Sequence, residues 1–196
     1  MSSPVQICSN ALLLLGAQTI AALTESSDRA VLMSNLYDQV RRATLRSHIW
    51  NFAKARVLLS PDPTAPAFEW TARFQLPSDC LRVISVGEKG EHPDYAIEGR
   101  WILSNEASIK LGYISDIEDP NTFDALFVDA LCANLAFTGA YPVTKSEALQ
   151  KAMFALFEEK RKLARAIGAQ EEPPQEIDDS PMLNARRSGG YPTSTP

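Results

Sequence analysis

Apolar residues recur at helical spacing in four parts of the chain, and between the second and third parts they alternate with polar residues. The helical parts are residues 4–15, a long stretch that starts within 22–28 and breaks at His48-Ile49, residues 122–141, and residues 144–169. The alternating part, residues 52–115, is interrupted by Pro, Gly and Asp, which indicates short strands joined by turns. We therefore expect an α+β fold that is mainly α: a four-helix bundle with a small β lobe inserted between helices 2 and 3. The lobe is expected to be one antiparallel sheet of four to six strands.

The same pattern divides the chain into three regions. Residues 1–51 and 116–169 form the predicted helical bundle, and residues 52–115 form the inserted β lobe. Residues 170–196 are rich in acidic residues, Pro, Gly, Ser and Thr, a composition that does not fold alone. We expect this region to be an extended C-terminal arm that a partner subunit holds.

Local signals set the expected helix ends. Ser3 precedes Pro4, which suits a first helical position, and Gly16 suits a left-handed C-cap. Ser26 or Ser27 is expected to cap the second helix. Pro142 is expected to end the third helix, which is apolar almost all round and so is predicted to be central. Thr144-Lys145-Ser146-Glu147 reads as a capping box for the fourth helix, with Thr144 as the cap.

In the β lobe, Phe68, Trp70 and Phe74 alternate with polar residues, which predicts one buried and one wet face. The acidic run 116–121 lacks the central Gly and distal Glu of a calcium loop, so we interpret it as a turn that caps the next helix at Asn121 or Thr122. The predicted structural core includes residues from three helices and from the first strand: Leu36, Val40, Trp50, Phe52, Leu131, Leu135 and Leu156. In the fourth helix the predicted buried stripe is Leu149, Met153, Leu156, Leu163 and Ile167.

Composition narrows the class of protein. The 196 residues are 45% hydrophobic and 22% charged, as in an ordinary soluble globular chain, and the formal net charge of −5 argues against a general polyanion-binding surface. The three cysteines have no close pairs, so we expect free thiols in a reducing compartment. The apolar run 11–15 is too short to cross a bilayer and lacks a basic n-region, so we expect neither a membrane partner nor a signal peptide.

The search for catalytic chemistry gives no motif. His48 and His92 are the only histidines, and neither has metal-ligand spacing to a second His or to a Cys. No Gly-x-Ser-x-Gly elbow or phosphate-binding loop occurs. We expect no enzyme, no metal and no cofactor. A dispersed-site enzyme remains an alternative, and it would have to gather Asp116, Glu118, Asp119 or His48 in one cleft.

A further set of residues stands in a characteristic order along the chain. Its first members are Asn10, Leu12, Leu15, Gly16, Ala17, Ile20, Leu23, Ala30, Tyr37, Arg41 and Leu45, followed by the run Trp50-Asn51-Phe52-Ala53. Its later members are Trp70, Leu76-Pro77, Asp79-Cys80-Leu81-Arg82-Val83, Tyr113-Ile114, Phe123, Leu135-Ala136 and Ala185-Arg186. In order and spacing, this set resembles the tail tubular protein A family, the adaptors between head and tail of short-tailed phages. The strongest piece is Trp50-Asn51-Phe52-Ala53, placed after an Arg-rich helix and before a strand.

The resemblance implies a structural virion protein: a dodecameric ring that joins the portal protein to the tail nozzle or tail tube and lines the channel through which double-stranded DNA passes. It implies a place in the virion neck after assembly in the cytoplasm of a bacterial host. The alternative from another class is a helical ligand-binding or regulatory module, with an apolar pocket between the bundle and the sheet.

Exposure and composition suggest where partners bind. The portal or a neighbouring subunit is expected on the end of the last helix and on the arm, at Arg161, Arg165, Ile167, Met182, Leu183, Arg186 and Arg187. An inter-subunit contact is expected on the β lobe, at Trp70, Phe74 and Trp101. The basic cluster from Lys160 to Arg165 complements the negative end of the helix, and nucleic-acid contact is the alternative role for it.

Overall fold

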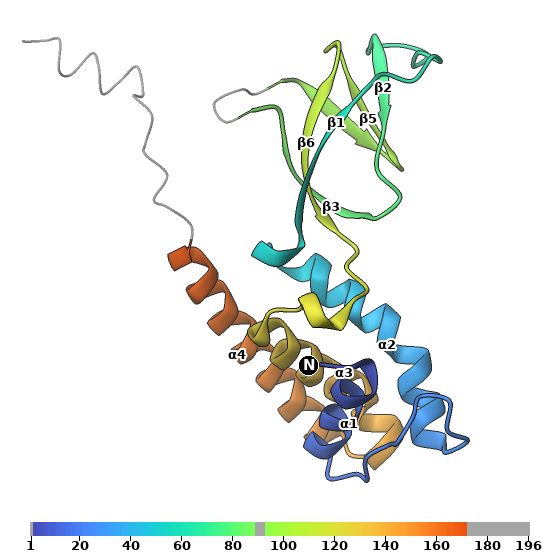
Figure 1. The fold of residues 1–196 in the computed structure, drawn as a ribbon, viewed down its shortest axis with the longest axis vertical. Helices are drawn as coiled ribbons and strands as arrows, with labels where there is room; N and C mark the ends of the chain where they lie inside the picture. The colour runs from blue at the N-terminus through green and yellow to red at the C-terminus, as the bar shows by residue number, and fades with distance from the viewer. Residues whose placement is uncertain (1, 89–92, 172–196) are drawn as a thin grey trace, which may run out of the picture.

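The computed structural model describes residues 2–88 and 93–171. Within these ranges the chain forms two lobes that lie one above the other along the longest axis of the molecule (Figure 1). The helical bundle consists of α1 (Pro4–Leu14), α2 (Asp28–Ser47), α3 (Ala125–Thr144) and α4 (Glu147–Glu171). The β lobe stands on the C-terminal end of α2, and α4 runs along the outside of the bundle (Figure 1).

Helix α3 is the centre of the bundle, as its apolar sequence predicts. It packs against α1, α2 and α4, and its buried residues include Phe127, Leu131 and Leu135. Small residues such as Ala133 and Gly139 are buried there too, which lets the neighbouring helices approach closely. By length and composition alone α3 is apolar enough to cross a membrane. Because three helices pack around α3, its apolar composition is that of a central core helix.

Two predicted helix ends are confirmed. The Ser3 hydroxyl accepts the N–H of Gln6, and the Ser27 hydroxyl accepts the N–H of Ala30. After α1 the chain turns through Gly16 at φ +69°, and the N–H groups of Gly16 and Ala17 donate to the carbonyls of Leu13 and Leu12. This pair of bonds is the Schellman motif that a left-handed glycine permits.

Both ends of α3 and the start of α4 differ from the prediction. Asp124 caps the start of α3, so the cap is neither Asn121 nor Thr122. Pro142 lies inside α3 near its end, and the helix continues to Thr144. The turn is made by Lys145 in the left-handed conformation, at φ +56°. Ser146 then caps α4 by accepting the N–H of Leu149, so the prediction of Thr144 as the cap was wrong. The hydroxyl of Thr144 instead donates to the carbonyl of Ala140, one turn back in α3.

The predicted single sheet was also wrong: six strands form two three-stranded antiparallel sheets. The first sheet has the order β1-β6-β3 and the second has the order β2-β5-β4. The strands are β1 (Lys54–Leu59), β2 (Ala72–Gln75), β3 (Cys80–Val86), β4 (Tyr95–Glu98), β5 (Trp101–Ser104) and β6 (Ile109–Ser115). The 3-10 helix Asn51–Ala53 leads into β1, and a second one, Pro120–Thr122, precedes α3.

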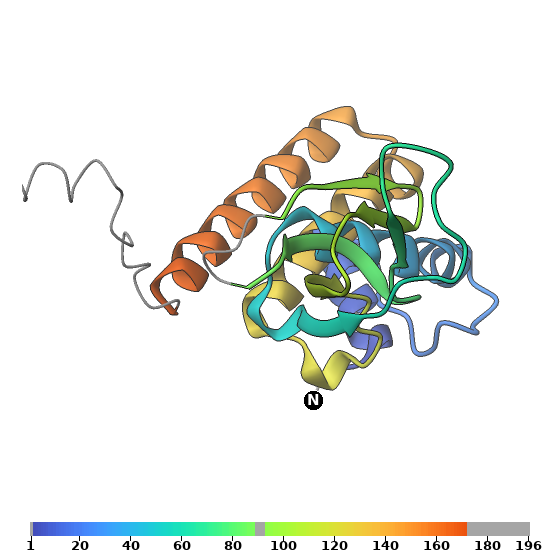
Figure 2. The same cartoon turned by 90° about the horizontal axis from the view of Figure 1, so that it is seen from above.

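Burial explains the division into two sheets. One three-stranded sheet leaves an apolar face uncovered, whereas two sheets cover each other. Phe74 and Ile102 of the second sheet share one buried cluster with Val86, Leu111 and Tyr113 of the first. Seen from above, the strands lie over the end of the bundle (Figure 2). The α+β class therefore holds, but the strand placement does not.

The larger core lies in the bundle. Among the predicted core residues, Val40, Trp50, Leu131 and Leu135 are buried, and Leu36, Phe52 and Leu156 are half-buried against them. An aromatic group joins Phe127 to Trp50, Phe52 and Phe123, with ring centroids 4.9–5.1 Å from Phe127. On α4 the buried face is shifted by part of a turn from the predicted stripe. Phe157 and Ala164 are buried, whereas Leu163 is exposed.

Candidate partner-binding surfaces

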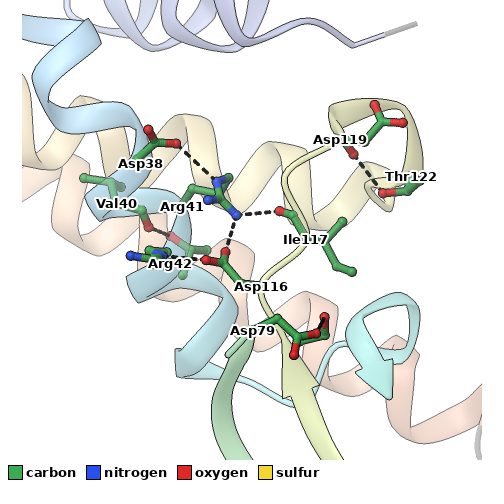
Figure 3. Close-up of polar contacts among 11 residues, drawn as sticks. Asp38, Val40, Arg41, Arg42, Asp79, Asp116, Ile117, Asp119 and Thr122 are labelled. Carbon is green, nitrogen blue, oxygen red and sulfur yellow. Dashed lines mark hydrogen bonds and ion pairs between the residues drawn. The ribbon is translucent and has the colours of Figure 1, made fainter. Parts of the chain in front are cut away.

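The two lobes are joined by a polar network around the buried side chain of Arg41 (Figure 3). Arg41 lies on α2 and is 2% exposed; its Nη1 donates to Asp116 Oδ1 at 2.5 Å and to the carbonyl oxygen of Ile117. Its Nε lies 3.6 Å from Asp38 Oδ1, one turn earlier on the same helix. Because Asp116 directly follows β6, these contacts tie the end of the β lobe to α2.

Two further arginines of α2 strengthen the junction. Arg42 Nε donates to Asp116 Oδ2 at 2.6 Å, and this hydrogen bond raises the pKa of Arg42. Arg46 donates to the carbonyl of Leu81 near the start of β3. Asp116 thus accepts from two guanidinium groups. A buried charge of this kind is stable only while its partner is present, so the buried guanidinium of Arg41 depends on Asp116.

Asp79 makes a second group of contacts at the same end of the lobe. Ser115 Oγ donates to Asp79 Oδ2 at 2.8 Å, Tyr113 Oη donates at 3.3 Å, and the N–H of Asp116 donates to the carbonyl of Asp79 at 2.8 Å. Burial and then the charge of Asp79 raise the pKa of Tyr113, so its hydroxyl stays a donor. These bonds hold the turn before β3 against β6.

A pocket of about 430 Å³ opens on the β lobe, where the loop before β2 meets β5. Its lining is aromatic and mixed in charge: Ala65, Pro66, Ala67, Phe68, Glu69, Trp70, Arg73, Glu98, Trp101 and Leu103. This set of residues is called the β-lobe pocket below. In Figure 1 the loop lies at the end of the lobe that points away from the bundle.

Charge contacts fix the wall of the β-lobe pocket. The guanidinium of Arg73 lies 4.3 Å from the ring centroid of Trp101 and donates to Asp62 Oδ1 at 2.9 Å. The backbone N–H of Thr64, followed by Arg73, lowers the pKa of Asp62. Trp70 and Trp101, two of the three residues predicted for an inter-subunit contact, line this pocket. The third, Phe74, is fully buried in the β-lobe core and is not available to another chain.

Phe68 is the exposed residue that the sequence interpretation missed. It was expected on a buried strand face, but it lies in the loop before β2 and is 76% exposed. Glu69 beside it has φ +67°, which breaks the extended geometry that an alternating strand needs. The prolines at 61, 63 and 66 are the sequence signal that could have placed Phe68 in a loop.

The second sheet also has an exposed edge. β4 is an edge strand, and Tyr95 and Ile97 are exposed side chains two residues apart, so they share one face. Leu58 on β1, an edge strand of the first sheet, is exposed as well. Edge strands with exposed apolar side chains are available for pairing with another chain.

On α4 the three residues predicted for partner binding have different surroundings. Arg161 Nη2 forms a 2.7 Å ion pair with Glu158, and its guanidinium carbon lies 5.8 Å from the Phe157 ring centroid. Arg165 is exposed, and Ile167 is half-buried. The remaining predicted residues, Met182, Leu183, Arg186 and Arg187, lie outside the described part of the chain.

The residues of the enzyme alternative have separate partners. Asp116 accepts from the arginines of α2, Asp119 caps the 3-10 helix through the N–H of Asn121, and Glu118 is exposed. His48 instead makes an edge-to-face contact with Trp50, with ring centroids 5.0 Å apart. Over residues 2–88 and 93–171, no group of three or more His, Cys, Asp and Glu side chains is placed to hold a metal ion.

The cysteines are buried thiols. Cys8 and Cys132 lie in the bundle core, where burial raises the pKa of each to about 12. Cys80 lies in the β-lobe core, and burial raises its pKa too. Thiols of this kind are poor nucleophiles near neutral pH.

No protein-family model matches the chain, and no curated protein matches it.

Proposed function

We propose that this protein is a structural virion subunit that forms a head-to-tail adaptor ring in the neck of a phage. In this role it joins the portal to the tail nozzle or tail tube and surrounds the DNA. The sequence resemblance given above motivates the proposal. Trp50-Asn51-Phe52-Ala53, the strongest piece of that resemblance, connects α2 to β1 at the junction of the two lobes.

The observation that carries the proposal is the exposure of apolar side chains on both lobes. Phe68, Leu58 and Ile97 are exposed on the β lobe, and Leu13 and Val31 are exposed on the bundle. A ring contact is heterologous, so each subunit must present two different faces to its two neighbours. A subunit with exposed apolar side chains on each lobe fits that requirement.

A closed ring also needs a fixed rotation from one subunit to the next. If each neighbour contacts both lobes, the angle between the lobes sets that rotation. The buried pair of Arg41 and Asp116 holds this angle. The net charge of −5 supports a channel role as well, because an acidic wall does not retain DNA.

The test is negative-stain microscopy of the protein with its own portal, beside each protein alone. A second ring stacked on the portal is the expected result. The Phe68→Ser variant is expected to weaken or abolish that ring, because Phe68 is exposed and its loss removes an apolar contact without a cost to the core. The matched control is Lys151→Ser on α4, another exposed side chain. Absence of association at any salt concentration would contradict the adaptor role.

The β-lobe pocket favours a second candidate, a ligand-binding module. Its aromatic lining of Trp70 and Trp101 suits a flat apolar ligand held by stacking. A ligand-binding module differs from the ring in stoichiometry: the protein would stay a small fixed oligomer with the portal present. Quenching of tryptophan emission by a ligand, lost in Trp101→Ala, is the expected sign of this function.

A further inference from the structure

A basic cluster lies near His48, the residue that follows α2, and its members come from β1, β3 and α4. Its cations are Lys54 at the start of β1, Arg82 on β3, and Arg161 and Arg165 on α4. Burial, followed by these four positive charges, lowers the pKa of His48. These five residues are called the His48 cluster below.

His48 lies close to α4, the helix that carries Arg161 and Arg165. A Cβ atom added at Gly168 would lie 3.9 Å from His48 Nε2, so the imidazole lies against the last turns of that helix. Arg161 is paired with Glu158, whereas Arg165 forms no ion pair with any residue that the structure describes. Arg165 is therefore a cation of the cluster that no ion pair balances within the described residues.

The chain leaves α4 beside this cluster. Asn51 Nδ2 donates to Glu171 Oε2 at 2.9 Å, which places the last residue of α4 next to the start of β1. The eight residues that follow, 172–179, contain Glu172, Glu176, Asp178 and Asp179 and no Lys or Arg. An acidic segment thus begins beside the His48 cluster, which carries the exposed guanidinium of Arg165.

We propose that the acidic segment 172–179 binds the His48 cluster of its own subunit. Eight extended residues span at most about 27 Å, enough to cross a cluster that starts at the preceding residue. A tethered segment has an effective concentration in the millimolar range, so it outcompetes a free polyanion of similar charge for the same surface. This inference goes beyond the adaptor role and does not depend on it, because it concerns the isolated subunit.

The first experiment measures the pKa of His48 by NMR in the full-length chain. The His92→Gln background leaves His48 as the sole imidazole. In that background we replace the four acids with amides: Glu172→Gln, Glu176→Gln, Asp178→Asn and Asp179→Asn. The expected result is a lower pKa for His48, because the carboxylates no longer offset the four cations. The difference should shrink between 0.1 M and 1 M salt, as the screening length falls from about 10 Å to about 3 Å.

The matched control removes the same amount of charge elsewhere. Glu69, Asp94, Glu98 and Glu106 are exposed residues of the β lobe, and their four amide replacements should leave the pKa of His48 unchanged. An equal fall in both variants would show a net-charge effect and overturn the proposal. No change in either variant would overturn it too.

The second experiment tests the position of the segment directly. A nitroxide on Ser180→Cys should broaden the His48 imidazole signals strongly, and a nitroxide on Ser194→Cys at the chain end should broaden them less. The native thiols are buried, so the introduced cysteine is labelled selectively. The broadening from residue 180 should disappear in Arg161→Glu/Arg165→Glu.

A mixing experiment shows whether the segment that binds the His48 cluster belongs to the same subunit or to a neighbouring one. Spin-labelled protein without isotope enrichment is mixed with enriched, unlabelled protein. Broadening only within one chain supports the proposal. Broadening that appears only in the mixture would assign the segment to a neighbouring subunit and overturn the contact within one chain.

Discussion

The bundle and the β lobe place their large apolar side chains in different ways. In the bundle, α3 is surrounded by three helices, and Phe127 is fully buried within an aromatic group. In the β lobe a smaller core lies between two three-stranded sheets, and Phe68 is 76% exposed outside it. The bundle therefore holds the larger buried core, whereas the β lobe leaves one of its large aromatic rings in water.

The strongest test of this difference applies one substitution to both lobes. Phe127→Ala should lower the free energy of unfolding by about 3–5 kcal/mol, because it removes a buried ring and leaves a cavity. Phe68→Ala should change it by no more than about 0.5 kcal/mol, because the ring is already in water. Denaturant titration followed by circular dichroism measures both. Equal losses of unfolding free energy would mean that the loop before β2, like α3, is part of the folding core.

The next largest effect is expected at the junction. Asp116→Ala leaves the buried guanidinium of Arg41 without its carboxylate and should cost about 3 kcal/mol. Arg42→Gln is the matched control on the same carboxylate. Arg42→Gln should lower the free energy of unfolding much less than Asp116→Ala does, because the Arg42 side chain is 56% exposed and water replaces the contact.

The same pair of variants tests how the lobes are coupled. If the junction joins them into one unit, Asp116→Ala should separate the unfolding of the two lobes into two transitions by calorimetry. A single transition at an unchanged temperature would contradict both the cost and the coupling.

Local sequence signals predicted the helices and most strands but not how the strands pair. Helical spacing and the caps at Ser3 and Ser27 act within one turn, so the sequence alone reveals them. Alternation marks each strand, yet it carries no information on which of the other strands lies beside it. For this reason one sheet of four to six strands was predicted, whereas the structure has two sheets of three strands.

The burial of Arg41 could not be predicted from the sequence either. Arg41 looks like an ordinary polar residue of an amphipathic helix, and its partner Asp116 is 75 residues away in the sequence. Asp116 itself was interpreted as part of an acidic turn. Only the fold brings the two together, so a single sequence without relatives gives no signal for the junction.

Smaller losses of stability are expected at two glycines, one limited by its backbone conformation in the bundle and one by side-chain crowding in the β lobe. Gly16 follows α1 at φ +69°, and a Cβ added there meets no atom within 4 Å. Gly16→Ala should therefore cost about 1–2 kcal/mol through the left-handed backbone alone. Gly16→Asn should cost less, since Asn tolerates this conformation. Thermal unfolding of the two variants decides the point, and equal losses would contradict it.

The smallest effect is expected at Gly112 on β6, where crowding and not the backbone is limiting. A Cβ added there would lie 2.6 Å from the Ser85 Oγ on the neighbouring strand β3 but 3.9 Å from the Ser85 Cβ. Gly112→Ala should cost about 1 kcal/mol, because the hydroxyl can turn away from the new methyl group. In a Ser85→Ala background the clashing oxygen is gone, so the same substitution should cost clearly less. A double-mutant cycle by denaturant titration measures the coupling. A cost that is unchanged by Ser85→Ala would mean that β6 resists the methyl group through its backbone, as Gly16 does in the bundle.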